Sequence, residues 1–432
     1  MKRTHVIRLL APALSTALAL VLATSPAAQS TAIAIVGGTV YPASGERIEK
    51  ATVLIRDGRI EAVGANVAVP PDAERVDAAG RWVTPGLINV VSQLGIVEIP
   101  LSAGPTDERA NGQNAIAAAF RPWESFNAAS PLLAATRNDG ITTIGIFPAG
   151  NLISGQHALV DLGVGPTEAM LRRAPSAVAA QAQHAPSAGT ASRGELLLKL
   201  RRLLEEARDW PDRREAFDEN RSRPLLATPA DYEALQPVIA GELPLIVWVD
   251  RAAEIDALLR LAREFGIRLV LGSASEAWHR ADALAAAGVP VIVGGIRNIP
   301  DSFDRLGTRD DNAALLRRAG VTVILVSDSY GDGTHFNTRN IRFEAGNAVA
   351  NGMSWDDALR AVTVAPAEVF GVADRVGTLR PGLDANVVVW TGDPFEFDTR
   401  AEVVFVRGVR VDAPSRQDEL MERYRTLPPS YR

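Results

Sequence analysis

The chain has 432 residues, of which 47% are hydrophobic, 22% charged and 6% aromatic, and its formal net charge is −6 at pH 7. These values exclude a disordered chain, a collagen-like repeat and a disulfide-rich mini-protein, and the length allows a large buried core. No basic stripe stands out and cysteine is absent, so we expect no nucleic-acid partner, no disulfide and no thiolate metal ligand.

The first segment, residues 1–28, has the layout of a secretory signal peptide. Basic residues at the start precede an apolar run over 9–24, and small residues follow over 25–28. A transmembrane anchor is the alternative, because the run approaches the ~20 residues that span a bilayer. We expect cleavage, since Pro12 interrupts the run and small residues end it. The sequence therefore predicts a periplasmic or secreted protein without membrane contact after cleavage.

Short strands and turns are predicted near both ends of the chain. An Asp57-Gly58 pair between two β-rich runs is a strong hairpin signal. The predicted strands are 33–36, 52–56, 59–63, 385–390 and 403–406. We expect one small β-domain that combines residues 29–84 with residues 371–432.

The middle of the chain alternates predicted strands and helices. Each strand is a continuous apolar run of about five residues, as parallel strands buried on both faces require. Repeated βα units favour an α/β barrel over an open sheet. The strands are 141–146, 243–249, 267–271, 289–293 and 321–326, and the helices are 251–265, 276–287 and 310–319. Residues 173–193, rich in Ala, Ser, Pro and Gln, are predicted to form a loop, with a mobile lid as the functional alternative.

A series of motifs runs along the chain in a characteristic order. The N-terminal motifs lie at 37–41, 53–64 and 80–88, and the C-terminal ones at 340–350, 358–363, 365–367 and 376–385. They resemble the amidohydrolase superfamily, in particular its imidazolonepropionase-like branch. The resemblance implies an α/β fold, a TIM-like (β/α)8 barrel over residues 85–370 with a small β-sandwich formed from both chain ends. It also implies hydrolysis of C–N bonds of non-peptide or cyclic amides, with one or two divalent ions that activate water.

The metal ligands that the resemblance implies are missing from this sequence. The family carries His-x-His on the first barrel strand, a carboxylated Lys or a Glu on the fourth, one His each on the fifth and sixth, and an Asp on the eighth. Here Val91 and Gln93 replace the His pair, Trp248 replaces the fifth-strand His, and residues 269–274 contain no His. We therefore name no metal ligand, and expect as cofactor at most one weakly held divalent ion, zinc or manganese.

Candidate site residues follow from strand ends and loops. Asp328 ends the last predicted barrel strand, where functional side chains of a barrel lie, and is the predicted catalytic residue; a loop-holding role is the alternative. The residues predicted to bind substrate are Asn151, Gln156, His157, Trp248, Asp250 and His335. For 148–157 the alternative is a turn with a packed histidine, for Asp250 a helix N-cap, and for His335 a surface residue.

Three functions remain open from the sequence. The first is an exported amidohydrolase that cleaves C–N bonds. The second is a catalytically degenerate amidohydrolase that binds a ligand or a protein, since Val91 and Trp248 make the barrel mouth more apolar. The third is a structural subunit that pairs with an active paralogue. The expected partner is a small-molecule ligand in the barrel mouth, and a homo-oligomer remains open.

Overall fold

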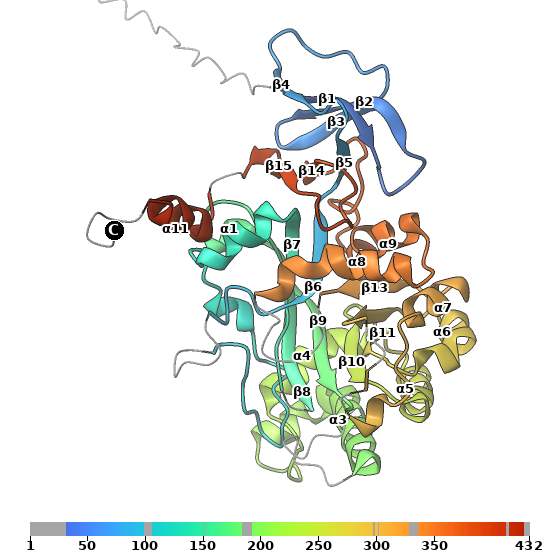
Figure 1. Cartoon of the computed structure of the whole chain (residues 1–432). Helices are drawn as coiled ribbons and strands as arrows, with labels where there is room; N and C mark the ends of the chain where they lie inside the picture. Colours follow the sequence, from blue (N-terminus) through green and yellow to red (C-terminus); the bar gives the residue numbers. More distant parts are fainter. Residues whose placement is uncertain are drawn as a thin grey trace, which may run out of the picture.

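The computed structural model describes residues 32–98, 106–150, 152–183, 192–296, 299–300, 302–327, 336–411 and 414–426. Its strands form two eight-stranded sheets, one built from both ends of the chain and one from the middle (Figure 1). The middle sheet curls until β13 lies beside β6, which nearly closes a barrel. The predicted fold class, a TIM-like barrel plus a sheet from both chain ends, is thereby confirmed.

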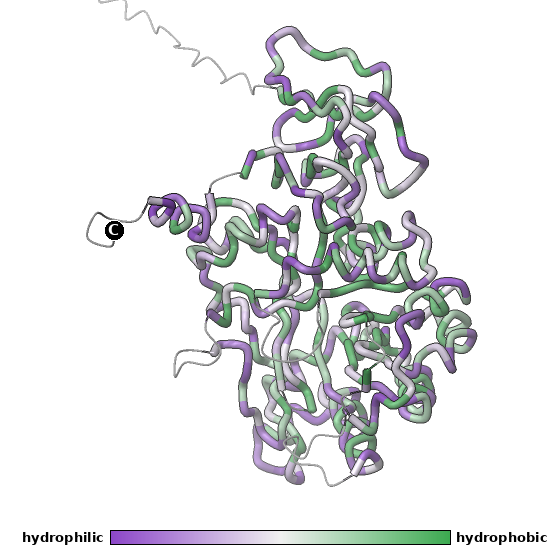
Figure 2. Tube along the Cα trace, viewed as in Figure 1, coloured by the Kyte–Doolittle hydropathy of each residue, from purple (hydrophilic) through white to green (hydrophobic). Residues whose placement is uncertain are grey.

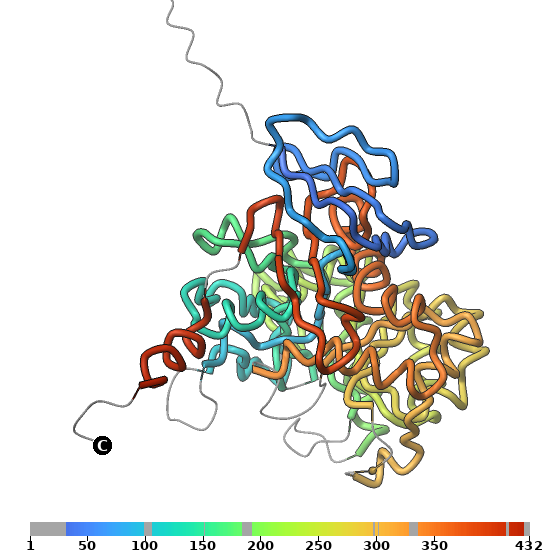
Figure 3. Tube along the Cα trace, turned by 45° about the horizontal axis from the view of Figure 1, so that its top comes forward, coloured from blue at the N-terminus to red at the C-terminus, as the bar shows by residue number. Residues whose placement is uncertain are grey.

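The terminal sheet joins segments that are more than 300 residues apart. β5 (Trp82–Pro85) pairs with β14 (Val387–Trp390), so strands from the two chain ends lie side by side (Figure 3). The other strands of this sheet are β1 (Ile33–Val40), β2 (Ile48–Arg56), β3 (Arg59–Gly64), β4 (Glu74–Asp77), β15 (Ala401–Val406) and β16 (Val409–Arg410). The Asp57-Gly58 hairpin between β2 and β3 forms as predicted, with positive φ at both residues.

Apart from the longer β8 and β9, the barrel strands are short, and all but β9 are almost wholly buried, as apolar sequences predict (Figure 2). They are β6 (Leu87–Ser92), β7 (Ile141–Ile146), β8 (Ile153–Asp161), β9 (Leu171–Gln181), β10 (Leu245–Val249), β11 (Leu269–Ser273), β12 (Val291–Gly294) and β13 (Val323–Val326). β8 departs from a regular barrel because it runs antiparallel to both β7 and β9. Antiparallel neighbours need no crossover helix, and the short connection 162–170, which ends in the four-residue α2 (Thr167–Met170), joins β8 to β9.

The prediction of a loop over 173–193 is wrong for its first part, because β9 extends to Gln181. Residues 176–180 are buried between the ladders of β8 and β10. Small side chains give these residues low intrinsic β-propensity. They fit the crowded barrel wall, however, and packing there outweighs propensity.

Helices cover the outside of the barrel. The apolar face of α5 (Ala252–Phe265) packs on the strands at helical spacing, and Gly266 ends the helix with a positive φ. The other helices are α1 (Pro131–Asn138), α3 (Arg193–Asp218), α4 (Pro229–Ile239), α6 (Ala281–Ala287), α7 (Asn312–Arg318), α8 (Ile341–Ala350), α9 (Trp355–Ala361), α10 (Val364–Val369) and α11 (Arg416–Tyr424). Single 3-10 turns are η1 (Pro122–Ser125), η3 (Ala277–Arg280), η4 (Phe303–Arg305) and η5 (Asn337–Asn340). Among the described residues, none of the helices has the length and hydropathy to span a bilayer.

A buried charge network ties the barrel to the terminal sheet. The Arg172 side chain is 4% exposed and lies between Asp161 and Asp384, whose side chains are 1% and 4% exposed. Arg375 and Arg407 approach the same two carboxylates from the surface. Because Asp161 ends β8 and Asp384 precedes β14, the network fixes the position of the two sheets relative to each other.

Candidate functional site

The barrel interior is filled with apolar side chains up to the level where the strands end. Val91 of β6, Trp248 of β10 and Phe147 after β7 belong to one buried cluster. The rings of Phe147 and Trp248 lie 5.3 Å apart, edge to face. Gly272 of β11 sits in register with Trp248, and a Cβ atom at 272 would overlap the indole ring. The glycine thus makes room for the tryptophan at the position of the implied fifth-strand ligand.

The opposite end of the barrel is closed by α10 and the turn that follows it. Ala367, Val369 and Phe370 belong to the same interior cluster as Trp248. The backbone of Ile88 donates to the carbonyl oxygen of Val362, which anchors this segment at the start of β6. The end at which the strands terminate is the end that carries function in barrels, so the candidate site is sought there.

Asp250 lies just beyond β10 and is the centre of a polar network at the barrel mouth. Its carboxylate accepts hydrogen bonds from Ser273 Oγ at 2.5 Å, Ser275 Oγ at 2.7 Å and Gln183 Nε2 at 2.6 Å. Arg305 Nε lies 3.4 Å from the same group. The structure therefore joins four segments at Asp250. The N-cap residue of α5 is Arg251, and the first N–H group of the helix, that of Ala252, donates to Glu276 Oε2, so the N-cap alternative for Asp250 is wrong.

Ser273 and Arg305 complete this network. Ser273 Oγ accepts from Arg305 Nη2 at 2.8 Å while it donates to Asp250. Both Ser273 and Ala274 have positive φ, at 65° and 51°, a conformation that side chains other than glycine adopt at an energetic cost. Sequence reasoning missed Gln183, Ser273 and Arg305. Its one available signal was the small polar run Gly-Ser-Ala-Ser that follows an apolar strand.

A void of about 30 Å³ lies beside this network, between the ends of β11 and β12 and the start of α7. Its lining includes Ser275, Arg305, Thr308 and Asn312. The Nδ2 atom of Asn312 donates to the carbonyl oxygen of Ala274 at 3.1 Å, whereas its Oδ1 atom is buried without a hydrogen-bond partner among the described residues. The void is thus bordered by the hydrogen-bond donors of Arg305 and Thr308 and by the unpaired acceptor Asn312 Oδ1.

A second group of charges borders the mouth. Arg193 at the start of α3 lies 2.7 Å from Glu254 of α5 and also contacts Asp304 of η4. Burial raises the pKa of Glu254 to about 7, although the charge of Arg193 acts in the opposite direction. These contacts hold α3, α5 and η4 together beside Asp250.

His157 is fully buried, as the packed alternative requires, but the loop or turn predicted over 148–157 is wrong from residue 153 onward, because Ile153–Asp161 form β8. Its Nε2 atom lies 2.9 Å from the carbonyl oxygen of Val90, which can only accept, so Nε2 carries the proton. Nδ1 then accepts from Ser176 Oγ at 2.7 Å. Both ring nitrogens have partners within the protein, and Gly145 leaves the space that the ring occupies. Binding of a ligand by His157 stays a prediction.

The buried imidazole makes stability depend on pH. Burial lowers the pKa of His157 from 6.5 to about 4, so the unfolded chain binds more protons between these values. Stability present at pH 7 is therefore lost as the pH falls from about 6.5 to 4, by about 3 kcal/mol. Urea unfolding across this range should show this decrease of the unfolding free energy with falling pH in the wild type and in His279→Gln, but not in His157→Gln. An equal pH dependence in all three proteins would contradict the assignment of the effect to His157.

The remaining predicted site residues are less informative. Gln156 is 5% exposed and donates to the carbonyl oxygen of Ala118 at 3.1 Å, which links β8 to the segment before η1. Asn151, Asp328 and His335 lie outside the described residues. The structure thus brings together Trp248 and Asp250 at the end of β10, and places His157 within the barrel interior.

The residues present do not fit the metal that the resemblance implies. Val91 and Trp248 offer no donor atom, and the neutral amide of Gln93 is a poor zinc ligand. Across the described part of the chain, no three His, Asp or Glu side chains are grouped so that they could hold a metal ion. No catalytic step is therefore derived through a metal.

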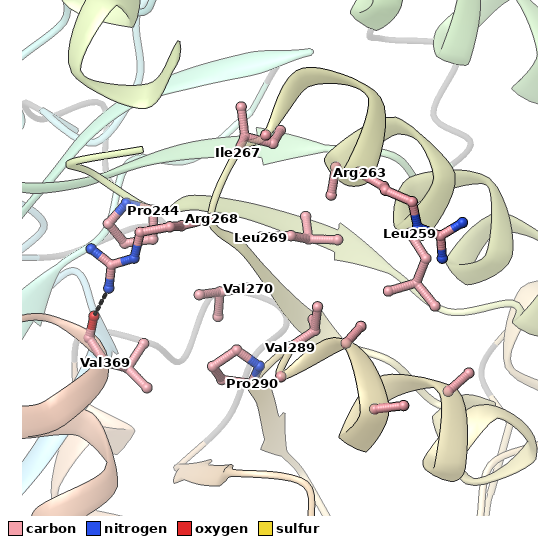
Figure 4. Close-up of a pocket in the computed structure, with 16 residues that line it drawn as sticks. Pro244, Leu259, Arg263, Ile267, Arg268, Leu269, Val270, Val289, Pro290 and Val369 are labelled. Atoms are coloured by element: carbon pink, nitrogen blue, oxygen red, sulfur yellow. Dashed lines mark hydrogen bonds between the residues drawn. The ribbon is translucent and has the colours of Figure 1, made fainter. Parts of the chain in front are cut away.

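A larger cavity, of about 710 Å³, lies at the other end of the strands. Figure 4 shows Leu269 and Val270 at the start of β11 on its floor, with Arg263 and Arg268 on opposite sides. Arg268 donates to the carbonyl oxygen of Val369 at 3.3 Å. The start of the strands is the face of a barrel that serves stability, so this cavity is not the candidate site.

Comparisons with known proteins agree with this architecture. The profile described as "Amidohydrolase family" matches residues 248–411. Imidazolonepropionases from Bradyrhizobium sp. and Mesorhizobium japonicum are 27% and 25% identical to this chain, and each alignment covers 84% of it and 91% or 90% of the relative. The amidohydrolase tasK of Hapsidospora irregularis is 24% identical over 82% of this chain, which spans only 39% of that protein's length.

A solved structure supports the same assignment. The amidohydrolase from Thermotoga maritima superposes with a TM-score of 0.79 at 25% identity, over 88% of this chain and 99% of that one. The likeness covers both the barrel and the sheet from the chain ends. The profile match, the imidazolonepropionase relatives and this structure together support the assignment of the chain to the amidohydrolase superfamily, as an imidazolonepropionase-like member.

Proposed function

We propose that this chain is an exported member of the superfamily that recognises an amide-type ligand at the barrel mouth and does not hydrolyse it through a bound metal. The observation that carries the proposal is Trp248, which fills the position of the implied fifth-strand ligand with Gly272 shaped around it. A chain that kept a metal there would need a donor atom, and an indole ring offers none.

The ligand class follows from the polar groups beside the mouth. The buried Oδ1 atom of Asn312 accepts nothing from the described residues, and leaving such an atom unpaired costs about 1–3 kcal/mol. Arg305 and Thr308 supply donors on the same void. The void of about 30 Å³ has room for about one water-sized group. An amide ligand at the mouth could therefore place only its N–H or its carbonyl tip there, the first facing Asn312 and the second facing Arg305.

Metal-free hydrolysis of a C–N bond is the second candidate. Ser273 favours it, because its hydroxyl group sits on strained backbone and donates to the Asp250 carboxylate. Asp250 also accepts from Ser275 and Gln183, however, so its carboxylate oxygens already have hydrogen-bond partners and no oxygen is held ready to take the Ser273 proton. The geometry favours binding over turnover for this reason.

The first test is the metal content of the purified protein after dialysis against zinc and manganese, measured by elemental mass spectrometry. We expect far less than one ion per chain, and no hydrolysis of a panel of cyclic amides with or without added metal. About one retained ion per chain, together with metal-dependent hydrolysis, would overturn the proposal. Hydrolysis that persists in chelator would support the second candidate.

The same panel tests recognition directly. Calorimetry should find cyclic amides that bind the wild type and bind Asn312→Ala about tenfold more weakly, as expected for a lost buried hydrogen bond. Asn351→Ala, at the end of α8, is the matched control and should bind normally. Export has its own test: the N-terminus of the protein recovered from outside the cytoplasm should lie near residue 29.

A further inference from the structure

Three aromatic rings from different parts of the chain meet where the terminal sheet contacts the barrel helices. Tyr41 follows β1, Trp82 belongs to β5 and Trp355 begins α9. The centroids of Tyr41 and Trp82 lie 4.5 Å apart, those of Tyr41 and Trp355 4.7 Å apart, and those of Trp82 and Trp355 5.6 Å apart. The interplanar angles are 29°, 50° and 75°, so the rings form a corner and not a flat stack.

A hollow of about 580 Å³ adjoins this aromatic corner. Besides the three rings it is lined by Glu46, Arg47 and Asp356. The first two lie in the β1–β2 connection, which reaches toward α9 in Figure 1. Its volume exceeds that of a small organic ligand, and the hollow is remote in the fold from the strand ends that form the barrel mouth.

The charges around the hollow are mainly negative. Glu46 and Asp356 are exposed and form no ion pair within the described part of the chain. Arg47, the one basic residue of the lining, lies 3.3 Å from Glu49 and is partly neutralised by it. Aromatic faces carry a negative quadrupole, so the rings and the two carboxylates attract the same kind of ligand.

A further carboxylate holds the corner in shape. Trp355 Nε1 lies 3.0 Å from both carboxylate oxygens of Asp393. This bond fixes the orientation of the indole ring and places a negative charge at its edge. Burial raises the pKa of Tyr41 above its usual value of 10.0, so the phenol stays neutral at pH 7.

We propose that this hollow is a binding site for a small organic cation of the quaternary ammonium class. Electron-rich ring faces bind such cations without having to replace a tight hydration shell, and carboxylates at the rim add long-range attraction. Inorganic divalent ions prefer several oxygen ligands at close range, which an aromatic corner does not offer. The proposal is independent of the function assigned to the barrel mouth.

The test compares choline with its neutral isostere 3,3-dimethyl-1-butanol on the full-length mature protein, by tryptophan fluorescence and ligand-observed NMR. We expect choline to bind at least about tenfold more tightly than the alcohol, since shape is matched and only charge differs. Tetramethylammonium should compete with choline. Equal binding of choline and the alcohol, or binding of neither at 100 mM, would overturn the proposal.

Substitutions of exposed residues change the charge around the hollow without disturbing the fold, so they test binding separately from stability. Glu46→Gln and Asp356→Asn should each weaken choline binding several-fold, whereas Arg47→Gln should strengthen it, because it removes the one competing positive charge in the lining. Trp355→Leu should abolish binding. Glu124→Gln, an exposed carboxylate of η1, is the control and should bind like the wild type. Binding that ignores the charge variants would place the ligand elsewhere and contradict the assignment.

Discussion

Replacing Arg172 with methionine is expected to lower the free energy of unfolding by about 3–5 kcal/mol. The substitution keeps an unbranched stem like that of arginine but removes the guanidinium group, which leaves Asp161 and Asp384 buried without their shared cation. Uncompensated buried charge is the costliest result of breaking such a network. Urea unfolding at pH 7 measures the change, and Arg375→Met, at a residue whose side chain is 45% exposed, should cost much less.

At acid pH, the difference in unfolding free energy between the wild type and Arg172→Met should become smaller. Burial acts to raise the pKa of Asp384, but hydrogen bonds from Arg172 and Arg375 outweigh it and the pKa is lowered overall. In the wild type the carboxylate therefore contributes stability above the unfolded pKa of about 3.9, and this contribution is lost as the pH falls below that value. In Arg172→Met the contribution is already missing. If the difference in unfolding free energy between the two proteins stayed constant from pH 7 to 3, the stabilising role of the Arg172 network would be contradicted.

The second large effect is expected for Trp248→Ala, with a loss of about 3–5 kcal/mol. The indole is 3% exposed and packs on Phe147 inside the barrel. Its removal leaves a cavity that strands of a closed barrel cannot collapse into. Thermal or urea unfolding at pH 7 measures the loss, and Trp278→Ala, at a partly exposed residue of η3, should lose less.

Gly272 provides a double-mutant test of the same packing. Gly272→Ala should cost about 1–3 kcal/mol in the wild type, because the added methyl group overlaps the Trp248 ring. In the Trp248→Ala background the overlap disappears, so the second substitution should be nearly neutral or stabilising. Additive losses would mean that Gly272 is required for another reason.

Local apolar runs predicted most of the barrel. The strand expected at 141–146 matches β7 residue for residue, and the helix expected at 251–265 differs from α5 by one residue. Such runs predict strands well because a strand buried on both faces is apolar throughout, without an alternation of polar and apolar residues. The loop prediction over 173–193 is wrong for residues 173–181, because the strand there depends on the neighbouring β8 and β10 and on small side chains that fit between them.

The candidate site was accessible from the sequence only in part. Trp248 lies in β10 and Asp250 directly follows that strand, so their i, i+2 spacing predicted that they share a side. The partners of Asp250 come from Gln183, Ser275 and Arg305, up to 67 residues away in the chain. No local sequence pattern connects those positions. The positive φ angles of Ser273 and Ala274 were also not predictable from the sequence, because neither residue is glycine or asparagine.

By itself, the sequence predicted the superfamily, the order of strands and helices from β10 to β13, and the replacement of metal ligands by Val91, Gln93 and Trp248. These are properties of residue type and of spacing along one element. Only the tertiary structure decided the reversed direction of β8, the network around Asp250 and the aromatic corner of Tyr41, Trp82 and Trp355. Each of these depends on contacts between segments far apart in the chain, and such contacts are selected by the packing of the whole barrel and sheet.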